Sequence, residues 1–63
     1  MWTEEEKNKF NIAINKYGKN FKRISKFIGN RTYKSCMGYG ATFRRIHKDS
    51  QDPEYIEILR ILK

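Results

Sequence analysis

Residues 21–47 read FKRISKFIGNRTYKSCMGYGATFRRIH, and this stretch decides the fold. Apolar side chains recur every three or four positions in its first eight residues and again in its second half, which is the spacing of one helical face. Between the two halves, Gly29–Arg31 predicts a tight turn, and Thr32 is a good N-cap for the helix that follows. We therefore expect helices over about 21–28 and 33–47, joined as a helix-turn-helix.

A helix over about 3–17 is expected before this motif. Residues 3–6, Thr-Glu-Glu-Glu, predict a capping box, in which the Thr3 hydroxyl accepts from the Glu6 amide while the Glu6 carboxylate accepts from the Thr3 amide. Gly18 is a natural end for this helix. Its apolar residues have the i, i+3, i+4, i+7 spacing of one face: Phe10, Ala13, Ile14 and Tyr17.

A short fourth helix is expected over 53–63, after a polar linker at 49–52. Asp52 followed by Pro53 is a strong start signal, because proline is favoured at the first helical position. One stripe of this helix is apolar and must be covered by the preceding helices, by a twin chain or by other parts of a larger parent protein; the stripe contains Tyr55, Ile58, Leu59 and Leu62.

The core is expected to come from apolar and aromatic residues of the first three helices. Gly38 and Gly40 weaken the third helix by about 1 kcal/mol each relative to alanine, so we expect close packing of this helix against another backbone. The expected core residues are Trp2, Phe10, Ala13, Ile14, Tyr17, Phe21, Ile24, Ile28, Cys36, Tyr39, Phe43 and Ile46.

Length and composition exclude several classes of protein. A chain of 63 residues has room for one small domain. One cysteine cannot close an internal disulfide, and one cysteine with one histidine offers no zinc set, so we expect no metal and no cofactor. Cys36 and His47 lie about 16 Å apart along one helix, which excludes a nucleophile–base pair in a monomer. The longest apolar run, Ile12–Ile14, is far too short for a membrane span. We expect a soluble, intracellular, non-enzymatic protein.

Positive charge is concentrated in the helix-turn-helix. The whole chain has a net charge of +7, whereas residues 18–48 contain nine Lys and Arg residues and no Asp or Glu. The first helix is neutral overall and the last fifteen residues are mildly acidic. This localisation favours a polyanionic partner along the helix-turn-helix over an evenly solvated basic surface.

Several short motifs resemble a Myb/SANT repeat over residues 2–48: Trp-Thr-Glu-Glu-Glu at 2–6, Tyr17-Gly18 and Arg31-Thr32. The resemblance implies an all-α fold, a three-helix helix-turn-helix bundle to which the short fourth helix is added, and a nuclear protein of transcription or chromatin. In such repeats spaced aromatic residues form the core; Trp2 matches the first, and Phe21 stands where a second tryptophan is usual.

The resemblance extends to particular members. Tyr39, Phe43 and the adjacent pair Arg44-Arg45 are most similar to co-repressor SANT domains. The segment 52–56 looks more loosely like the SANT region of the B-double-prime subunit of the RNA polymerase III initiation factor. The chain departs from Myb repeats at the third aromatic position, which here falls on Gly40.

This departure affects the DNA-reading role. The positions that read bases in Myb repeats fall on Lys34, Met37, Gly38 and Ala41, of which only Lys34 can donate a hydrogen bond. We therefore expect DNA binding mainly through phosphates, or alternatively a SANT-type module that engages histone tails or a deacetylase, with or without an inositol phosphate. The expected nucleic-acid-binding residues are Lys22, Arg23, Lys26, Arg31, Tyr33, Lys34, Met37, Ala41, Arg44, Arg45 and Lys48.

Two of these residues have alternative roles. Arg31 precedes a helix N-cap and can pair with the carboxylates of Glu4–Glu6 as easily as with phosphate. Tyr33 can stack on a base or sugar, or can be a partly buried ring facing the turn.

Met1 directly before Trp2 suggests a domain excised from a longer parent.

Overall fold

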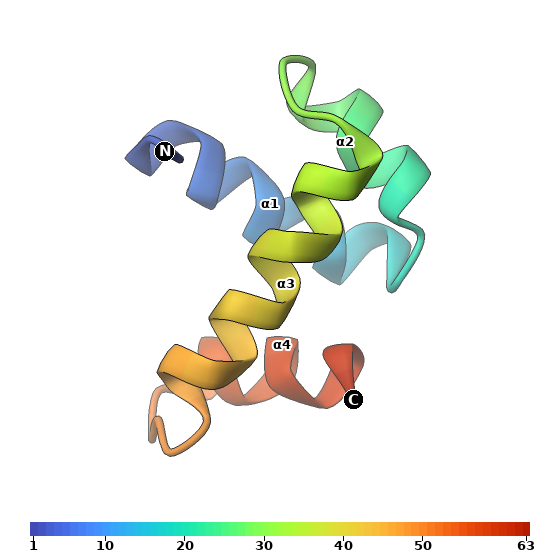
Figure 1. Ribbon diagram of the computed structural model, residues 1–63. Helices are drawn as coiled ribbons and strands as arrows, with labels where there is room; N and C mark the ends of the chain where they lie inside the picture. Colours follow the sequence, from blue (N-terminus) through green and yellow to red (C-terminus); the bar gives the residue numbers. More distant parts are fainter.

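The computed structural model describes all residues, 1–63, and consists of four helices without strands (Figure 1). They are α1 (Glu4–Tyr17), α2 (Phe21–Ile28), α3 (Tyr33–His47) and α4 (Pro53–Leu62). The expected all-α class, with a short C-terminal helix added to a three-helix bundle, is confirmed. Helix α1 begins one residue later than expected because Thr3 is its N-cap.

Side-chain caps fix where each helix begins. The capping box of α1 is present: the Glu6 amide donates to Thr3 Oγ1 at 3.2 Å, and the Thr3 amide donates to Glu6 Oε1 at 2.8 Å. Thr32 Oγ1 accepts from the Ser35 amide at 3.1 Å. Gly29 ends α2 with a φ of 94°, a conformation that residues with a side chain rarely adopt. These caps set the short connection that places α3 across α2.

The core lies where the four helices meet. Aromatic side chains join α1 to α3: the Trp2 and Tyr39 rings stack at 4.3 Å between centroids, and Phe10 meets Tyr39 edge-on at 4.7 Å. Such pairs add to the free energy gained from burial. The buried hydrophobic residues are Phe10, Ala13, Ile14, Ile24, Ile28, Cys36, Phe43, Ile58 and Leu62.

The other expected core residues are less buried. Trp2, Tyr17, Phe21 and Tyr39 are partly buried and pack against the core. The prediction of Ile46 as a core residue is wrong, because its side chain is 64% exposed. Ile46 is about 80° around α3 from Cys36, so it points past the core toward an open groove beside α1.

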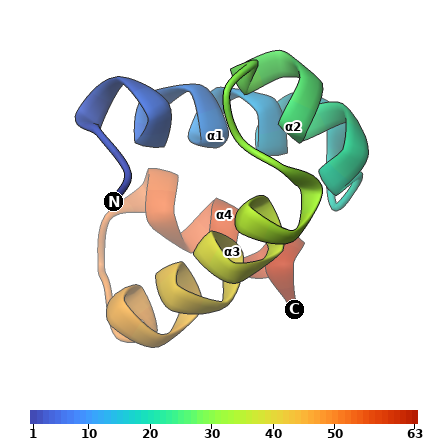
Figure 2. The ribbon, with the colours of Figure 1, turned by 45° about the horizontal axis from the view of Figure 1, so that its top comes forward.

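Helix α4 packs against both α1 and α3, and Figure 2 shows it behind α3 and below α1. Ile58 and Leu62 are buried, whereas Ile56 is 41% exposed. Three further apolar residues pack partly buried against the core: Tyr55, Leu59 and Ile61. The domain's own core therefore covers the apolar stripe of α4. None of the four helices has the length and apolar content needed to cross a membrane.

The two glycines of α3 have different surroundings. A Cβ on Gly40 would lie 3.3 Å from Leu62 Cδ2 and 3.5 Å from Phe21 Cε1, whereas a Cβ on Gly38 would meet nothing within 4 Å. The expected close approach is thus present only at Gly40, and it is to side chains rather than to another backbone. Leu62 of α4 and Phe21 of α2 occupy the space beside the position where Myb repeats carry an aromatic residue.

Candidate nucleic-acid interface

One face of α3 is open to solvent along the whole helix. We call it the α3 solvent face, and at about 100° per residue its members span an arc of roughly 120° opposite the core residues. All seven of its residues are exposed. The α3 solvent face consists of Lys34, Met37, Gly38, Ala41, Arg44, Arg45 and Lys48.

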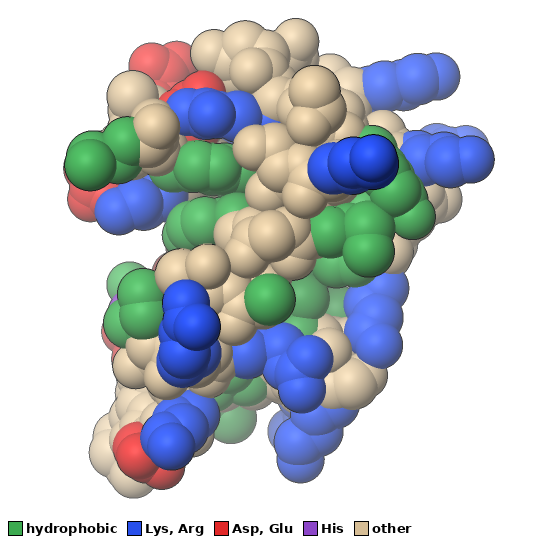
Figure 3. Space-filling model, viewed as in Figure 1, with side chains coloured by type: hydrophobic (Ala, Val, Ile, Leu, Met, Phe, Trp, Pro, Cys, Tyr) green, Lys and Arg blue, Asp and Glu red, His purple; other side chains and the backbone are tan.

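The positive charges of this face have no acidic partner. The ion pairs of the molecule are Lys9–Glu5, Arg31–Glu6 and Arg60–Glu57, none of which includes a cation of the α3 solvent face. Figure 3 shows basic side chains along α3, with acidic ones only toward the margins of this view. Arg44 and Arg45 lie in the last turn, where cations also interact favourably with the helix dipole. The face is therefore free to bind an external anion.

Helix α2 adds further exposed cations: Lys22, Arg23 and Lys26. The Arg23 guanidinium carbon lies 5.8 Å from the centroid of the Tyr17 ring, a geometry that orients this side chain. In Figure 3 basic side chains project over α2 at the upper right of the face that shows α3. The two helices of the helix-turn-helix thus present positive charge together.

Arg31 differs from the other expected phosphate ligands because it is bound internally. Its Nε donates to Glu6 Oε2 at 2.8 Å, and its Nη2 donates to Glu6 Oε1 at 2.9 Å and to the Met1 carbonyl at 2.7 Å. Its guanidinium carbon lies 5.1 Å from the centroid of the Trp2 ring. These hydrogen bonds lower the pKa of Glu6 to about 2 and raise the pKa of Arg31. Of the two alternatives for Arg31, this geometry favours pairing with the α1 carboxylates.

Comparison with known families identifies the domain. The family model described as Myb-like DNA-binding domain matches residues 1–46. The chain belongs to the Myb-like DNA-binding domain family. Neither a curated protein nor a solved structure matches it significantly. Myb-like domains are DNA-binding and non-enzymatic modules. The single cysteine, Cys36, is fully buried, and burial raises the pKa of its thiol.

The four positions that the Myb resemblance assigns to base reading are exposed but poor in polar groups. Lys34, Met37, Gly38 and Ala41 all lie on the α3 solvent face, with Met37 44% exposed. Tyr33, at the start of α3, is 43% exposed, which is compatible with both of its expected roles. Only the Lys34 ammonium offers a hydrogen-bond donor from these four positions, which limits direct readout of base edges.

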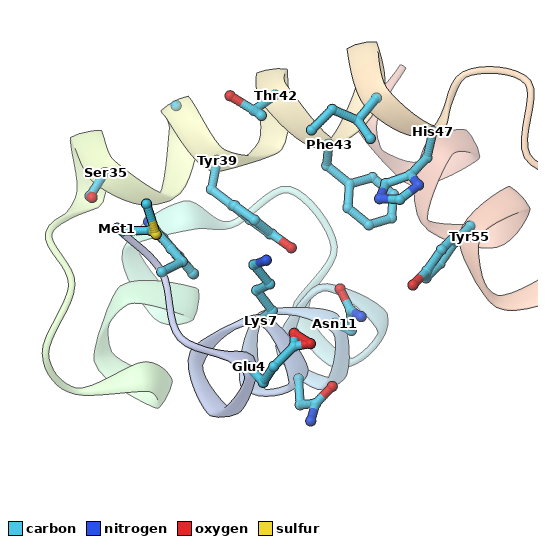
Figure 4. Close-up of a pocket in the computed structure, with 14 residues that line it drawn as sticks. Met1, Glu4, Lys7, Asn11, Ser35, Tyr39, Thr42, Phe43, His47 and Tyr55 are labelled. Atoms are coloured by element: carbon cyan, nitrogen blue, oxygen red, sulfur yellow. The ribbon is translucent and has the colours of Figure 1, made fainter.

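A groove between α1 and α3 was not expected from the sequence. Its volume is about 730 Å³, and Figure 4 shows Tyr39 and Phe43 of α3 reaching toward Lys7 and Asn11 of α1, with Tyr55 of α4 at one end. Burial raises the pKa of Tyr39 to about 12, and the buried Asn11 Oδ1 has no hydrogen-bond partner. The spacing of the aromatic residues predicted a filled core at this place. Spacing along one helix does not show how far that helix lies from another.

Proposed function

We propose that this Myb-like domain binds duplex DNA mainly through the phosphate backbone, with the α3 solvent face against the major groove, in a nuclear protein of transcription or chromatin. The observation that carries the proposal is the row of unpaired cations on α3, Lys34, Arg44, Arg45 and Lys48, beside base-reading positions that are otherwise Met, Gly and Ala. Phosphate contacts position a protein on DNA without carrying sequence information.

The cations of α2 support the same arrangement. Lys22, Arg23 and Lys26 are exposed. In helix-turn-helix proteins the second helix enters the major groove while the first crosses the backbone, so these side chains would reach phosphates beside the groove. Met37 and Ala41 would contact thymine methyl groups. We leave Arg31 out of the proposed interface because its guanidinium already binds Glu6.

A DNA titration of three proteins tests this function: the unsubstituted chain, the triple variant Lys34→Ala, Arg44→Ala, Arg45→Ala, and the matched triple variant Lys7→Ala, Lys9→Ala, Lys16→Ala on α1. Each phosphate contact steepens the salt dependence by about 0.9 in log–log slope. The α3 variant should lose affinity by roughly tenfold or more and flatten the slope by about 2.7. The α1 variant should change much less.

Two results would contradict the proposal. Equal losses in the two triple variants would mean that net charge, rather than the α3 solvent face, controls binding. A strong preference of the unsubstituted chain for one base sequence over its shuffled version would contradict recognition through the backbone. Circular dichroism of each variant verifies that it is folded.

A second candidate function, a SANT-type protein-interaction module, is favoured by the groove between α1 and α3. The groove combines aromatic walls with the exposed Ile46, features that suit an inserted peptide side chain. Binding of histone-tail peptides or a deacetylase, with and without an inositol phosphate, would be measured with the unsubstituted chain and with Ile46→Asp. Binding that Ile46→Asp abolishes and the α3 triple variant retains would establish this function instead.

A further inference from the structure

A basic hollow lies where the last turn of α4 meets the last turns of α3. A hollow of about 460 Å³ is lined there by Ala41, Arg44, Arg45, Lys48, Leu59 and Lys63. Four of these six residues are cations, none is acidic, and none of the four takes part in an ion pair. Hollows lined by charge of one sign over apolar walls concentrate the electrostatic field and attract counter-ions.

Helix α4 holds its contribution in place by packing. Leu62 is buried against Gly40, and Leu59 packs against the core while it lines the hollow. The Lys19 ammonium donates a hydrogen bond to the Lys63 carbonyl, which ties the end of α4 to the connection between α1 and α2. Lys63 directly follows Leu62, the last residue of α4, so the packing of α4 and the Lys19 hydrogen bond fix where its backbone lies.

Favourable interaction with helix ends explains single cations at the ends of α3 and α4. It does not explain why four cations, three from the end of α3 and one that follows α4, line one hollow. Figure 1 shows the C-terminal half of α3 crossing in front of the first half of α4, and Figure 3 shows basic side chains on both sides of that part of α3. The hollow is continuous with the α3 solvent face, because Ala41, Arg44, Arg45 and Lys48 belong to both.

We propose that this hollow binds a phosphate group of the DNA backbone, so that α4 extends the phosphate-binding surface of α3 through Lys63. The inference rests on the proposed function and assigns to α4 a role in DNA binding in addition to its role in the core. A DNA strand along the α3 solvent face would place one phosphate between the Arg45 and Lys63 side chains.

Two single substitutions on α4 test the inference. Lys63→Ala removes a cation that lines the hollow. Arg60→Ala removes a cation of α4 that lies outside the hollow and pairs with Glu57 at 3.6 Å. Both variants lower the net charge by one. Lys63→Ala should weaken binding to a duplex by about threefold to tenfold and flatten the log–log salt slope by about 0.9. Arg60→Ala should leave the slope unchanged.

The outcomes separate this inference from the function on which it rests. Equal affinities and slopes for Lys63→Ala and Arg60→Ala, in a chain that still binds DNA, would overturn the role of α4 alone. Failure of the unsubstituted chain to bind DNA would overturn both proposals. Matching thermal unfolding curves for the two variants would show that lost affinity does not come from lost structure, which is expected because Lys63 and Arg60 are both exposed.

Discussion

The two faces of α3 differ in almost every respect. The face toward the core contains Cys36, Gly40 and Phe43, which are buried; Gly40 lies beside Phe21 of α2 and Leu62 of α4, and Phe43 contacts Tyr55 of α4. The α3 solvent face contains cations without acidic partners, together with a glycine at position 38 that nothing approaches within 4 Å. The first face stabilises the fold, whereas the second is available for a partner.

The difference shows that a basic residue indicates a binding site only when no internal partner occupies it. Arg31 and Lys34 lie three residues apart around the start of α3, but the Arg31 guanidinium has two hydrogen bonds to Glu6 and lies against Trp2, whereas Lys34 has no acidic partner. The basic residues of 18–48 therefore differ in role: Arg31 is bound within the fold, whereas Lys34 is available to bind a partner.

The largest effect is expected from Phe43→Ala on the core face. Phe43 is 2% exposed and packs edge-on against Tyr55 with 5.3 Å between centroids. Its truncation should lower the free energy of unfolding by about 3–5 kcal/mol, which approaches the whole stability of a domain this small. The adjacent Arg44→Ala should change the free energy of unfolding by about 0.5 kcal/mol or less. Urea unfolding followed by circular dichroism measures both, and similar losses would contradict the division into two faces.

Gly38→Ala and Gly40→Ala add the same methyl group to the two faces of α3, and they should change the free energy of unfolding differently. At Gly38 the added Cβ meets open space, so the gain in helix propensity should raise the free energy of unfolding by about 1 kcal/mol. At Gly40 the added Cβ lies 3.3 Å from Leu62 Cδ2, and the crowding should cancel some or all of that gain. Equal stabilisation by the two substitutions would mean that Leu62 does not pack closely against α3.

The third effect is expected at the Glu6–Arg31 pair, and it depends on pH. Hydrogen bonds from Arg31 and Thr3 hold the pKa of Glu6 at about 2, below its ordinary value of 4.5. A carboxyl group with a lowered folded-state pKa stabilises the fold fully above its unfolded-state pKa, and this contribution is lost as the pH falls through the folded-state value. Stability should therefore decline between about pH 4.5 and 2.

Urea midpoints measured from pH 7 to pH 2 check this dependence, with Glu6→Gln as the comparison. The unsubstituted chain should lose more stability over the acidic range than Glu6→Gln, which has no carboxyl group at this position to protonate. Parallel curves for the two proteins would show that the Glu6–Arg31 pair does not stabilise the fold and that Arg31 is as available as Lys34.

Local sequence signals predicted the helices well. The capping box at Thr3 and Glu6 and the N-cap at Thr32 are confirmed, because each depends on residues three positions apart and on backbone groups that every helix start leaves unpaired. Periodicity alone did not fix the core, since Ile46 has acceptable spacing but is exposed at the groove between α1 and α3. The nucleic-acid-binding residues remain predictions.

Contacts between distant parts of the chain could not be predicted. The approach of Leu62 to Gly40 joins residues 22 positions apart, and sequence spacing does not show which helix covers a glycine. The pairing of Arg31 with Glu6 had to stay an alternative for the same reason. The hollow at Lys63 depends on the packing of α4 across α3, which no local pattern specifies.

The most direct test of the account is a nuclear magnetic resonance titration of the isotope-labelled chain with a short duplex. The account predicts that the largest amide shift changes occur along the α3 solvent face, at Lys34, Ala41, Arg45 and Lys48, and that they diminish as salt is added. Changes concentrated instead at the residues of the α1–α3 groove, or no changes with an excess of duplex, would contradict it.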